Sequence, residues 1–181
     1  IFFDLFSFCK IQCVSKKNHL EKKKLNVSII IPCKNESENI LSIFLELKKV
    51  RSEFEAIFVN DNSSDDTKKQ IINEINNNKI NAKVIDGEGI NKYRAVRLGV
   101  KNSTKTICII LDADLAVKAD EVDKCINLME TNNLELINCS RFIYRQKNFS
   151  MKILNFFGNK FFAILFSLIV KDHVTDTLCG T

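Results

Sequence analysis

Proline and glycine are scarce in this sequence, which has one proline and five glycines among its 181 residues. Each of them is therefore expected to mark a position where the backbone needs a special conformation. Hydrophobic residues make up 45% of the chain and charged residues 27%, which is the balance of an ordinary globular protein. The composition excludes a disordered chain, and the length suffices for one α/β domain with a real core.

The chain also lacks the cysteine pattern of a secreted protein. Its seven cysteines form no C-x-x-C pair, most lie in apolar runs, and their odd number argues against a disulfide framework. Residues 1–14 have neither the basic leader nor the cleavage site of a signal peptide, and they are too short to span a membrane. We therefore expect a cytoplasmic protein.

The net charge of +5 is unevenly distributed. Six lysines crowd into the first 25 positions, namely Lys10, Lys16, Lys17, Lys22, Lys23 and Lys24. Such a cluster can bind nucleic acid or anionic lipid, but a solvated linker has the same pattern. Because no zinc-finger spacing or stacking-aromatic pattern accompanies the lysines, no nucleic-acid partner is expected.

Two parts are predicted along the chain. Residues 1–25 form a basic N-terminal segment or the tail of a preceding domain, and residues 26–181 form the main domain. Because Thr181 follows Gly180 with no closing element, this domain is expected to be truncated at its C-terminus.

From Val27 onward, strand and helix patterns alternate. Short apolar runs predict strands at 27–31, ended by Pro32, and at 56–59, 82–85, 106–111 and 134–139. Helices are predicted at about 36–50, 66–76, 92–102 and 120–131, with Asn35 and Glu38 as a capping box for the first. Residues 106–111 are the most hydrophobic strand and are placed centrally. The alternation predicts an α/β fold with a mainly parallel, Rossmann-like sheet and helices on both faces.

Residues 150–170 predict a C-terminal amphipathic helix of a different character. Its narrow polar or small stripe consists of Lys152, Asn155, Asn159, Ala163 and Ser167, and most of the remaining surface is Ile, Leu and Phe. Such a helix is either buried or lies in a membrane interface, and the sequence leaves both open.

Asp112 and Asp114 are the sharpest chemical signal. They close a strongly apolar strand, where a charge is costly without a partner. Residues i and i+2 of an extended chain point to the same side, so two carboxylates meet where a hard cation such as Mg²⁺ or Mn²⁺ can bind. The cation would bridge a diphosphate and neutralise charge on the leaving group.

Other polar residues at strand ends are individually uninformative. Asp61 follows the second strand, where an acid can accept hydrogen bonds from a base or ribose or simply form a turn. Asn35 and Glu36 lie at a predicted helix start, where they are favoured without any ligand. Lys92, near the start of the third helix, can meet a phosphate or remain solvated.

As a set these features form an ordered pattern: strand-P-C-K-N-E, strand-N-D-N-S-S-D-D-T, G-x-N-K-x-x-A-V-x-x-G, strand-D-A-D-L and S-R-F. The pattern resembles the family-two glycosyltransferases of the GT-A fold. It is nearest the branch that glycosylates polyprenyl phosphates, such as dolichyl-phosphate mannose and glucose synthases. The resemblance runs from Val27 to the end. N-x-x-G-N-K-x-F at 155–162 and D-T-L-C-G-T at 176–181 resemble this branch's acceptor-side motif.

The resemblance implies an inverting, metal-dependent transferase of a hexose from a UDP- or GDP-sugar. It implies that the nucleotide sugar is bound by Pro32, Glu36, Val59 and Asp61, with Asn35 and Lys92 beside them, and by Asp112, Ala113, Asp114 and Arg141. Asp112 and Asp114 would hold Mg²⁺ or Mn²⁺. Two departures stand out: Asn91 and Tyr93 replace the usual glycines around Lys92, and Ala116 replaces a further metal ligand of some relatives.

The acceptor follows from what the motifs lack. A hydroxyl acceptor needs a general base, and the acidic base motif of hydroxyl-glycosylating relatives is missing. A phosphate monoester is already anionic, so a polyprenyl phosphate is expected, at the cytoplasmic face of a membrane. Asp114 and Arg141 would act in catalysis by charge stabilisation, and Asp176 is the fallback base.

Two alternatives stay open on the sequence alone. An inactive or incomplete nucleotide-binding remnant would keep the same motifs. A nucleotidyltransferase shares the sheet and the metal but typically opens with a Gly-rich phosphate loop, unlike PCKNESENI at 32–40. The sequence does not indicate the oligomeric state.

Overall fold

The computed structural model describes residues 10–14, 25–114, 117–132, 134, 136–140 and 153–170. The chain divides into two compact units, one of residues 23–126 and one of residues 1–22 with 127–181. The first unit contains β2 (Val27–Cys33), α1 (Ile40–Leu47), β3 (Phe54–Asn60), α2 (Thr67–Asn77), β4 (Ala82–Asp86), α3 (Lys92–Lys101), β5 (Ile107–Ile110) and the start of α4 (Ala119–Asn132). The second contains β1 (Lys10–Val14), β6 (Leu136–Ser140) and α5 (Ile153–Val170).

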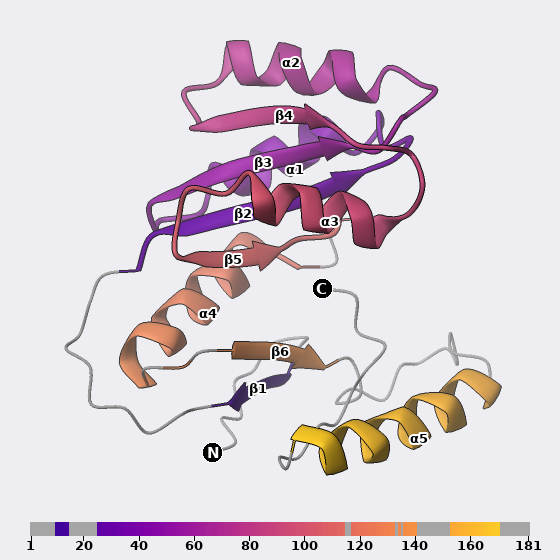
Figure 1. Cartoon of the computed structure of the whole chain (residues 1–181). Helices are drawn as coiled ribbons and strands as arrows, with labels where there is room; N and C mark the ends of the chain where they lie inside the picture. Colours follow the sequence, from indigo (N-terminus) through magenta and orange to yellow (C-terminus); the bar gives the residue numbers. More distant parts are fainter. Residues whose placement is uncertain are drawn as a thin grey trace. The chain divides into compact units, whose positions relative to one another are not determined.

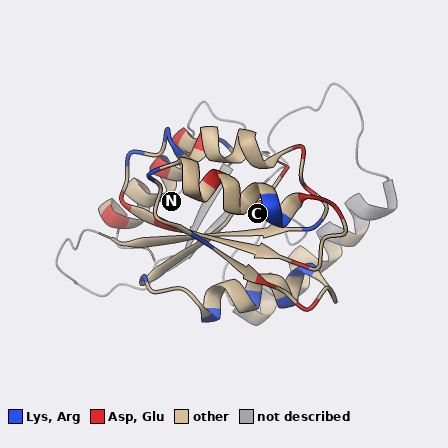
Figure 2. Ribbon diagram, turned by 90° about the horizontal axis from the view of Figure 1, so that it is seen from above, with Lys and Arg blue, Asp and Glu red and all other residues tan. Residues whose placement is uncertain are grey.

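The 23–126 unit is built on a parallel sheet with the strand order β4-β3-β2-β5. This confirms the predicted α/β fold with a mainly parallel sheet. The expected central position of the strand at 106–111 is wrong for the described residues, because β5 pairs only with β2 and lies at one edge. Its side chains are accordingly less buried than those of β2 and β3, the two inner strands. Figure 2 shows that charged residues lie mainly on helices and loops, whereas the strands carry few.

The sequence predicted that Pro32 ends the first strand, but β2 continues through Pro32 to Cys33. The Ile30 carbonyl accepts the Leu111 N–H at 2.9 Å, and the Cys33 carbonyl accepts the Asp61 N–H at 2.8 Å. Backbone groups alternate sides along a strand, so Pro32, like Ile30, faces the β5 side. There β5 has already ended at Ile110, and the missing N–H of proline breaks no ladder hydrogen bond.

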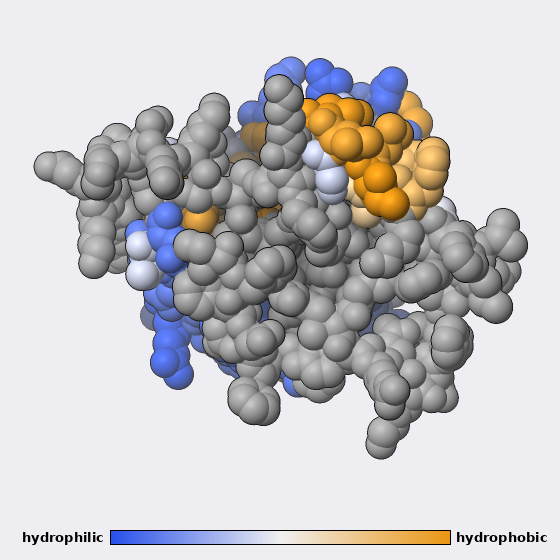
Figure 3. All heavy atoms as spheres, turned by 90° about the horizontal axis from the view of Figure 1, so that it is seen from below, coloured by the Kyte–Doolittle hydropathy of each residue, from blue (hydrophilic) through white to orange (hydrophobic). Residues whose placement is uncertain are grey.

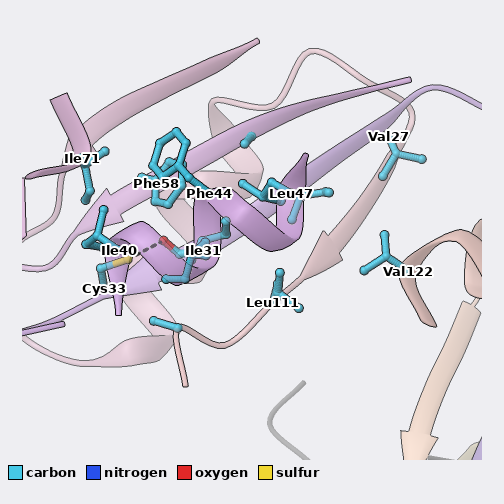
Figure 4. Close-up of a cluster of buried hydrophobic side chains, with 14 of the residues drawn as sticks. Val27, Ile31, Cys33, Ile40, Phe44, Leu47, Phe58, Ile71, Leu111 and Val122 are labelled. Carbon is cyan, nitrogen blue, oxygen red and sulfur yellow. Dashed lines mark hydrogen bonds between the residues drawn. The ribbon is translucent and has the colours of Figure 1, made fainter. Parts of the chain in front are cut away.

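Helices cover both faces of the sheet, as predicted, because alternate strand residues point to opposite sides. Figure 1 shows α3 on one face and α1 on the other. The larger core cluster joins Ile29, Ile31 and Phe58 to apolar residues of α1, α2 and α4. Figure 4 shows this cluster, in which the Phe44 and Phe58 rings stack at 4.9 Å between centroids. On the other face, Ile30, Ile57 and Val59 pack against Ala95 of α3.

Gly99 lets α3 approach the sheet closely. A Cβ atom at this position would lie 2.4 Å from Cγ2 of Ile30 and 3.2 Å from Cγ2 of Val59. No real side chain tolerates the first distance, so the helix axis would have to move away from β2 to admit even a methyl group. The last glycine of the G-x-N-K-x-x-A-V-x-x-G pattern therefore sets the distance between α3 and the sheet.

The first helix is shorter than predicted and is capped differently. α1 begins at Ile40 rather than at 36 and ends at Leu47, and Asn35 does not cap it. Asn35 instead has a positive φ of 57°, a conformation that asparagine tolerates better than most residues. The predicted capping box of Asn35 and Glu38 is therefore wrong. In contrast, α2, α3 and α4 begin and end within one residue of their predicted bounds.

The second unit contains a pairing that was not predicted. β6, at residues 136–140, overlaps the strand expected at 134–139, but it does not extend the parallel sheet. It pairs antiparallel with β1, so that Lys10 lies opposite Ser140 and Val14 opposite Leu136. Residues 10–14, taken from the sequence as part of a basic segment or preceding tail, thus form a strand. The predicted C-terminal helix is present as α5, while residues 150–152 lie outside the described residues.

Candidate functional site

The carboxyl ends of three strands meet the start of α3 around a pocket in the 23–126 unit. From β2 the chain proceeds outward through β3 and β4, and then returns to the other side of β2 to form β5. Such a reversal opens a crevice at the strand ends, where ligands bind in open α/β sheets. The pocket has a volume of about 270 Å³ and is lined by Pro32, Cys33, Lys34, Glu36, Asp61, Asn91, Lys92, Ala95, Asp112, Ala113 and Asp114.

Most of the predicted site residues line this pocket. The structure brings together Pro32, Glu36, Asp61, Lys92, Asp112, Ala113 and Asp114. Val59 does not line it, because its side chain is fully buried against Ile30 and Ala95. Asn35 lies beside the pocket in the loop after β2 and does not line it either. Arg141 and Asp176 lie outside the described residues, as does Ala116.

Sequence reasoning missed four lining residues, which are Cys33, Lys34, Asn91 and Ala95. The Asn91 side chain accepts a hydrogen bond from the Arg94 N–H at 3.0 Å and so caps α3. This cap places Lys92 at the first position of the helix, at the pocket. Asparagine is a preferred N-cap residue, so the capping signal was readable from the sequence.

Asp112 and Lys92 form the principal charged contact of the pocket. The Lys92 ammonium lies 2.5 Å from Oδ1 of Asp112. That oxygen is buried and accepts no hydrogen bond of good geometry, so the ion pair balances its charge. The Asp112 side chain is 15% exposed and the Lys92 side chain 49%, so the carboxylate is the more buried partner of the pair.

The acidic residues fit a divalent cation that also binds a diphosphate. Asp112 presents an oxygen that lacks a hydrogen bond, and Asp114 is exposed at the same rim of the pocket. Among the described residues no group of three or more His, Cys, Asp or Glu side chains can hold a metal. Two carboxylates supply only part of the shell that Mg²⁺ needs, and phosphate oxygens and water commonly complete it.

Asp61 anchors the loop that leads into α3. Its side chain is buried, with 2% exposure, and Oδ1 accepts the Gly89 N–H at 2.8 Å. Lys34 donates to the Gly89 carbonyl at 3.2 Å, so both peptide groups of this glycine are held. Gly89 has a φ of 74°, which glycine adopts without strain. The buried carboxylate of Asp61 therefore orders the pocket wall.

The loops after β2 and β3 are joined by hydrogen bonds between side chains and backbone. The Asn35 N–H donates to Ser63 Oγ at 3.0 Å, and Asn35 Oδ1 accepts the Ser64 N–H at 2.8 Å. Asp65 accepts hydrogen bonds from the Thr67 hydroxyl and from the Ser37 N–H, which lower its pKa to about 2. Asp65 is therefore charged at neutral pH, and the two loops are fixed to each other on the β3 side of the pocket.

Glu36 and Cys33 complete this wall. The Glu36 N–H donates to Thr67 Oγ1 at 2.8 Å, and its carboxylate accepts from the Asn39 amide at 2.7 Å. Burial, and to a lesser extent the charge of Glu36, raises the pKa of the Cys33 thiol to about 12. A thiol this weakly acidic is not a nucleophile at neutral pH, so Cys33 contributes shape rather than reactivity.

Comparison with known proteins extends over most of the chain. The model of the family "Glycosyl transferase family 2" matches residues 28–179. The uncharacterized protein MJ0544 of Methanocaldococcus jannaschii is 33% identical over 163 residues, which are 83% of this chain and 68% of that protein. The undecaprenyl-phosphate 4-deoxy-4-formamido-L-arabinose transferase of Proteus mirabilis is 29% identical over 115 residues, 60% of this chain and 35% of that enzyme.

Solved structures share the fold. The mannosyltransferase PcManGT from Pyrobaculum calidifontis, in complex with GDP-Man and Mn²⁺, has a TM-score of 0.55 at 18% identity. That alignment covers 59% of this chain and 33% of PcManGT. TarS of S. aureus in complex with UDP-GlcNAc has a TM-score of 0.51 at 25% identity, over 60% of this chain and 32% of TarS. The chain thus spans about a third of these solved proteins and of the arabinose transferase.

Proposed function

Because the chain belongs to glycosyl transferase family 2, we propose that it transfers a hexose, with inversion, from a UDP- or GDP-sugar to a phosphate acceptor. The observation that carries the proposal is the placement of Asp112, Asp114 and Lys92 in one pocket at the strand ends. This arrangement suits a diphosphate held between a cation-binding pair of carboxylates and an ammonium group.

The pocket residues divide into two groups by their chemistry. Asp61, Glu36 and Pro32 lie on the β2 and β3 side, where the carboxylates can accept hydrogen bonds from a base or ribose. Asp112 and Asp114 follow β5 and would hold Mg²⁺ or Mn²⁺ together with the diphosphate. PcManGT contains Mn²⁺ with its GDP-Man, which supports a metal role for this chain.

In the proposed reaction the residues of this chain mainly bind and orient the nucleotide sugar. A divalent cation, when bound, stabilises negative charge on the departing diphosphate. Asp112 and Asp114 would hold this cation. The loops joined through Asn35 and Asp65 hold the nucleotide half of the pocket in one geometry. Arg141 is proposed to meet the diphosphate or sugar and Asp176 to serve as the fallback base.

A polyprenyl phosphate is the proposed acceptor. Its phosphate is anionic at neutral pH and attacks without a general base. Among the described pocket residues, Asp61 and Glu36 are proposed to contact the nucleotide and Asp112 and Asp114 to hold the cation, so none of these acids is proposed as a general base. The relative from Proteus mirabilis is named for undecaprenyl phosphate, which supports this acceptor class.

Nucleotide binding is expected to depend on the metal. UDP or GDP should raise the melting temperature only in the presence of Mn²⁺ or Mg²⁺, because Asp112 and Asp114 otherwise repel the diphosphate. The stabilisation should grow with ligand concentration, as mass action requires. Thermal melts across a nucleotide series, with metal and with EDTA, measure both effects. Equal stabilisation in EDTA would exclude the metal from nucleotide binding.

We also propose that α5 contacts the cytoplasmic face of a membrane, where a polyprenyl acceptor resides. Figure 3 shows apolar side chains gathered on one exposed face. Those of α5 are Phe161, Phe162, Ile164, Leu165, Leu168 and Ile169, each at least 42% exposed, while Ala163 is buried. No helix in the described ranges is both long and apolar enough to span a bilayer. A helix of this kind can lie along the interface instead.

Vesicle flotation tests the membrane proposal. The wild type should float with anionic phospholipid vesicles, and Phe161→Ser with Leu168→Ser should lose at least half of the floating protein. Both side chains are exposed, at 65% and 72%, so the double variant should remain folded. Leu41→Ser with Leu45→Ser, on the exposed side of α1, is the matched control and should float like wild type. If both double variants float equally well, α5 does not contact the membrane.

A further inference from the structure

Lys92 pairs with an Asp112 oxygen that a cation would also bind. Its ammonium lies 2.5 Å from Oδ1, the oxygen that is buried and has no hydrogen bond of good geometry. The lysine side chain is 49% exposed and the aspartate side chain only 15%, so the lysine is the partner with the greater contact with solvent. Asp112 therefore has a counter-ion supplied by the chain itself.

A divalent cation and this ammonium group repel each other electrostatically if both contact the same oxygen. Magnesium binds carboxylate oxygens at roughly 2.0–2.1 Å, and a second positive charge close to the same oxygen repels it. The lysine has room to leave, because its side chain is half exposed and is attached at the first residue of α3. Its backbone stays fixed by the Asn91 cap, so only the side chain needs to turn.

We propose that Lys92 is a positioning residue that acts as a displaceable counter-ion. It neutralises Asp112 while the metal is absent, and on leaving Asp112 it pairs with the diphosphate that arrives with the metal. The inference rests on the proposed nucleotide-sugar function and adds to it a specific coupling. Nucleotide draws Lys92 away and so makes Asp112 a better metal ligand, and metal frees Lys92 for the nucleotide. By linkage both effects are equal in free energy.

Mn²⁺ binding without any nucleotide tests the first half of the proposal. Free Mn²⁺ is measured by electron paramagnetic resonance in the presence of the protein. Lys92→Gln should bind Mn²⁺ about three- to tenfold more tightly than wild type, the range expected for losing a partly exposed competing ion pair. Lys92→Arg keeps the competing cation and should resemble wild type.

Arg94→Gln is the matched control, because Arg94 lies on the same helix but pairs with Glu88 and does not line the pocket. It removes the same charge and should change Mn²⁺ affinity less than twofold. An equal gain in Arg94→Gln and Lys92→Gln would mean that general electrostatics, not displacement, is measured. Unchanged or weaker binding by Lys92→Gln would also overturn the proposal. Thermal melts establish that each variant is folded.

The second half is tested by repeating the titration with saturating UDP or GDP. Nucleotide should tighten Mn²⁺ binding by wild type several-fold more than by Lys92→Gln. Equal tightening in both proteins would contradict the coupling while leaving the proposed function intact. If wild type binds neither nucleotide, with or without Mn²⁺, then the proposed function itself fails.

Discussion

Asp114→Asn is expected to fold like wild type and to lose sugar transfer by about a thousandfold, the effect of removing one group that stabilises transition-state charge. The substitution nearly conserves volume, and Asp114 is exposed at the rim of the pocket, so it should not disturb the core. It removes one of the two carboxylate charges proposed to hold the metal that binds the diphosphate. Product formation from a panel of UDP- and GDP-sugars with a polyprenyl phosphate measures the loss.

Glu38→Asn or Glu38→Gln provides the comparison for this experiment. Glu38 is an exposed acid in the turn before α1 and does not line the pocket, so its neutralisation should leave transfer unchanged. Asp112→Asn should be as inactive as Asp114→Asn. Retention of most of the activity by Asp114→Asn would remove this residue from the reaction, while the fold assignment would be unaffected.

Phe58→Ala should be among the most destabilising single substitutions in the sheet, with an expected loss of about 3–5 kcal/mol in the free energy of unfolding. Phe58 lies on β3 with its side chain fully buried, and its ring stacks on Phe44 of α1 with an angle of 4° between planes. Truncation removes this contact and leaves a cavity that the neighbouring β-branched residues cannot fill. Urea denaturation followed by circular dichroism measures the change.

Leu41→Ala is the matched truncation on the neighbouring helix. Leu41 lies on α1 but is 56% exposed, so its removal leaves no cavity and should cost less than about 0.5 kcal/mol. A similar loss for Phe58→Ala and Leu41→Ala would mean that the cluster in Figure 4 is not closely packed.

The parallel sheet was predictable because its strands and helices alternate with clear hydrophobic periods. Residues 27–31 and 56–59 are continuous apolar runs, as strands covered on both faces require. The position of β5 was not predictable by the same reasoning. Hydrophobicity reports how much of a strand is covered, by helices or by neighbours, and does not specify which strand lies beside it.

The pairing of β1 with β6 illustrates a second limit. Residues 10–14 and 136–140 are separated by more than a hundred positions, and no turn signal links them. Antiparallel partners that are distant in sequence leave no local pattern, so the early apolar stretch suggested a tail. The prediction that Asn35 caps α1 was wrong for a local reason. Asn35 forms its hydrogen bonds with Ser63 and Ser64 in the loop after β3 rather than with its own helix.

The site could be predicted where residues immediately follow strands. Pro32, Asp61 and Asp112 were found because parallel strands place their carboxyl ends at one edge of the sheet. Val59 was assigned by resemblance alone, and the alternation of strand residues turns its side chain toward α3. Lys34 was missed because a lysine in a polar loop has no pattern that distinguishes it from a solvated one.

The close approach of α3 to the sheet at Gly99 links the position of this helix to the geometry of the pocket. Gly99 follows Lys92 by seven residues, about 10 Å along the helix axis at roughly 1.5 Å per residue. A larger residue at 99 would push its end of the helix away from Ile30, and a rigid helix would tilt at the other end, where Lys92 meets Asp112. The geometry of the charged pair is therefore set partly by a residue that lies two turns away and has no side chain.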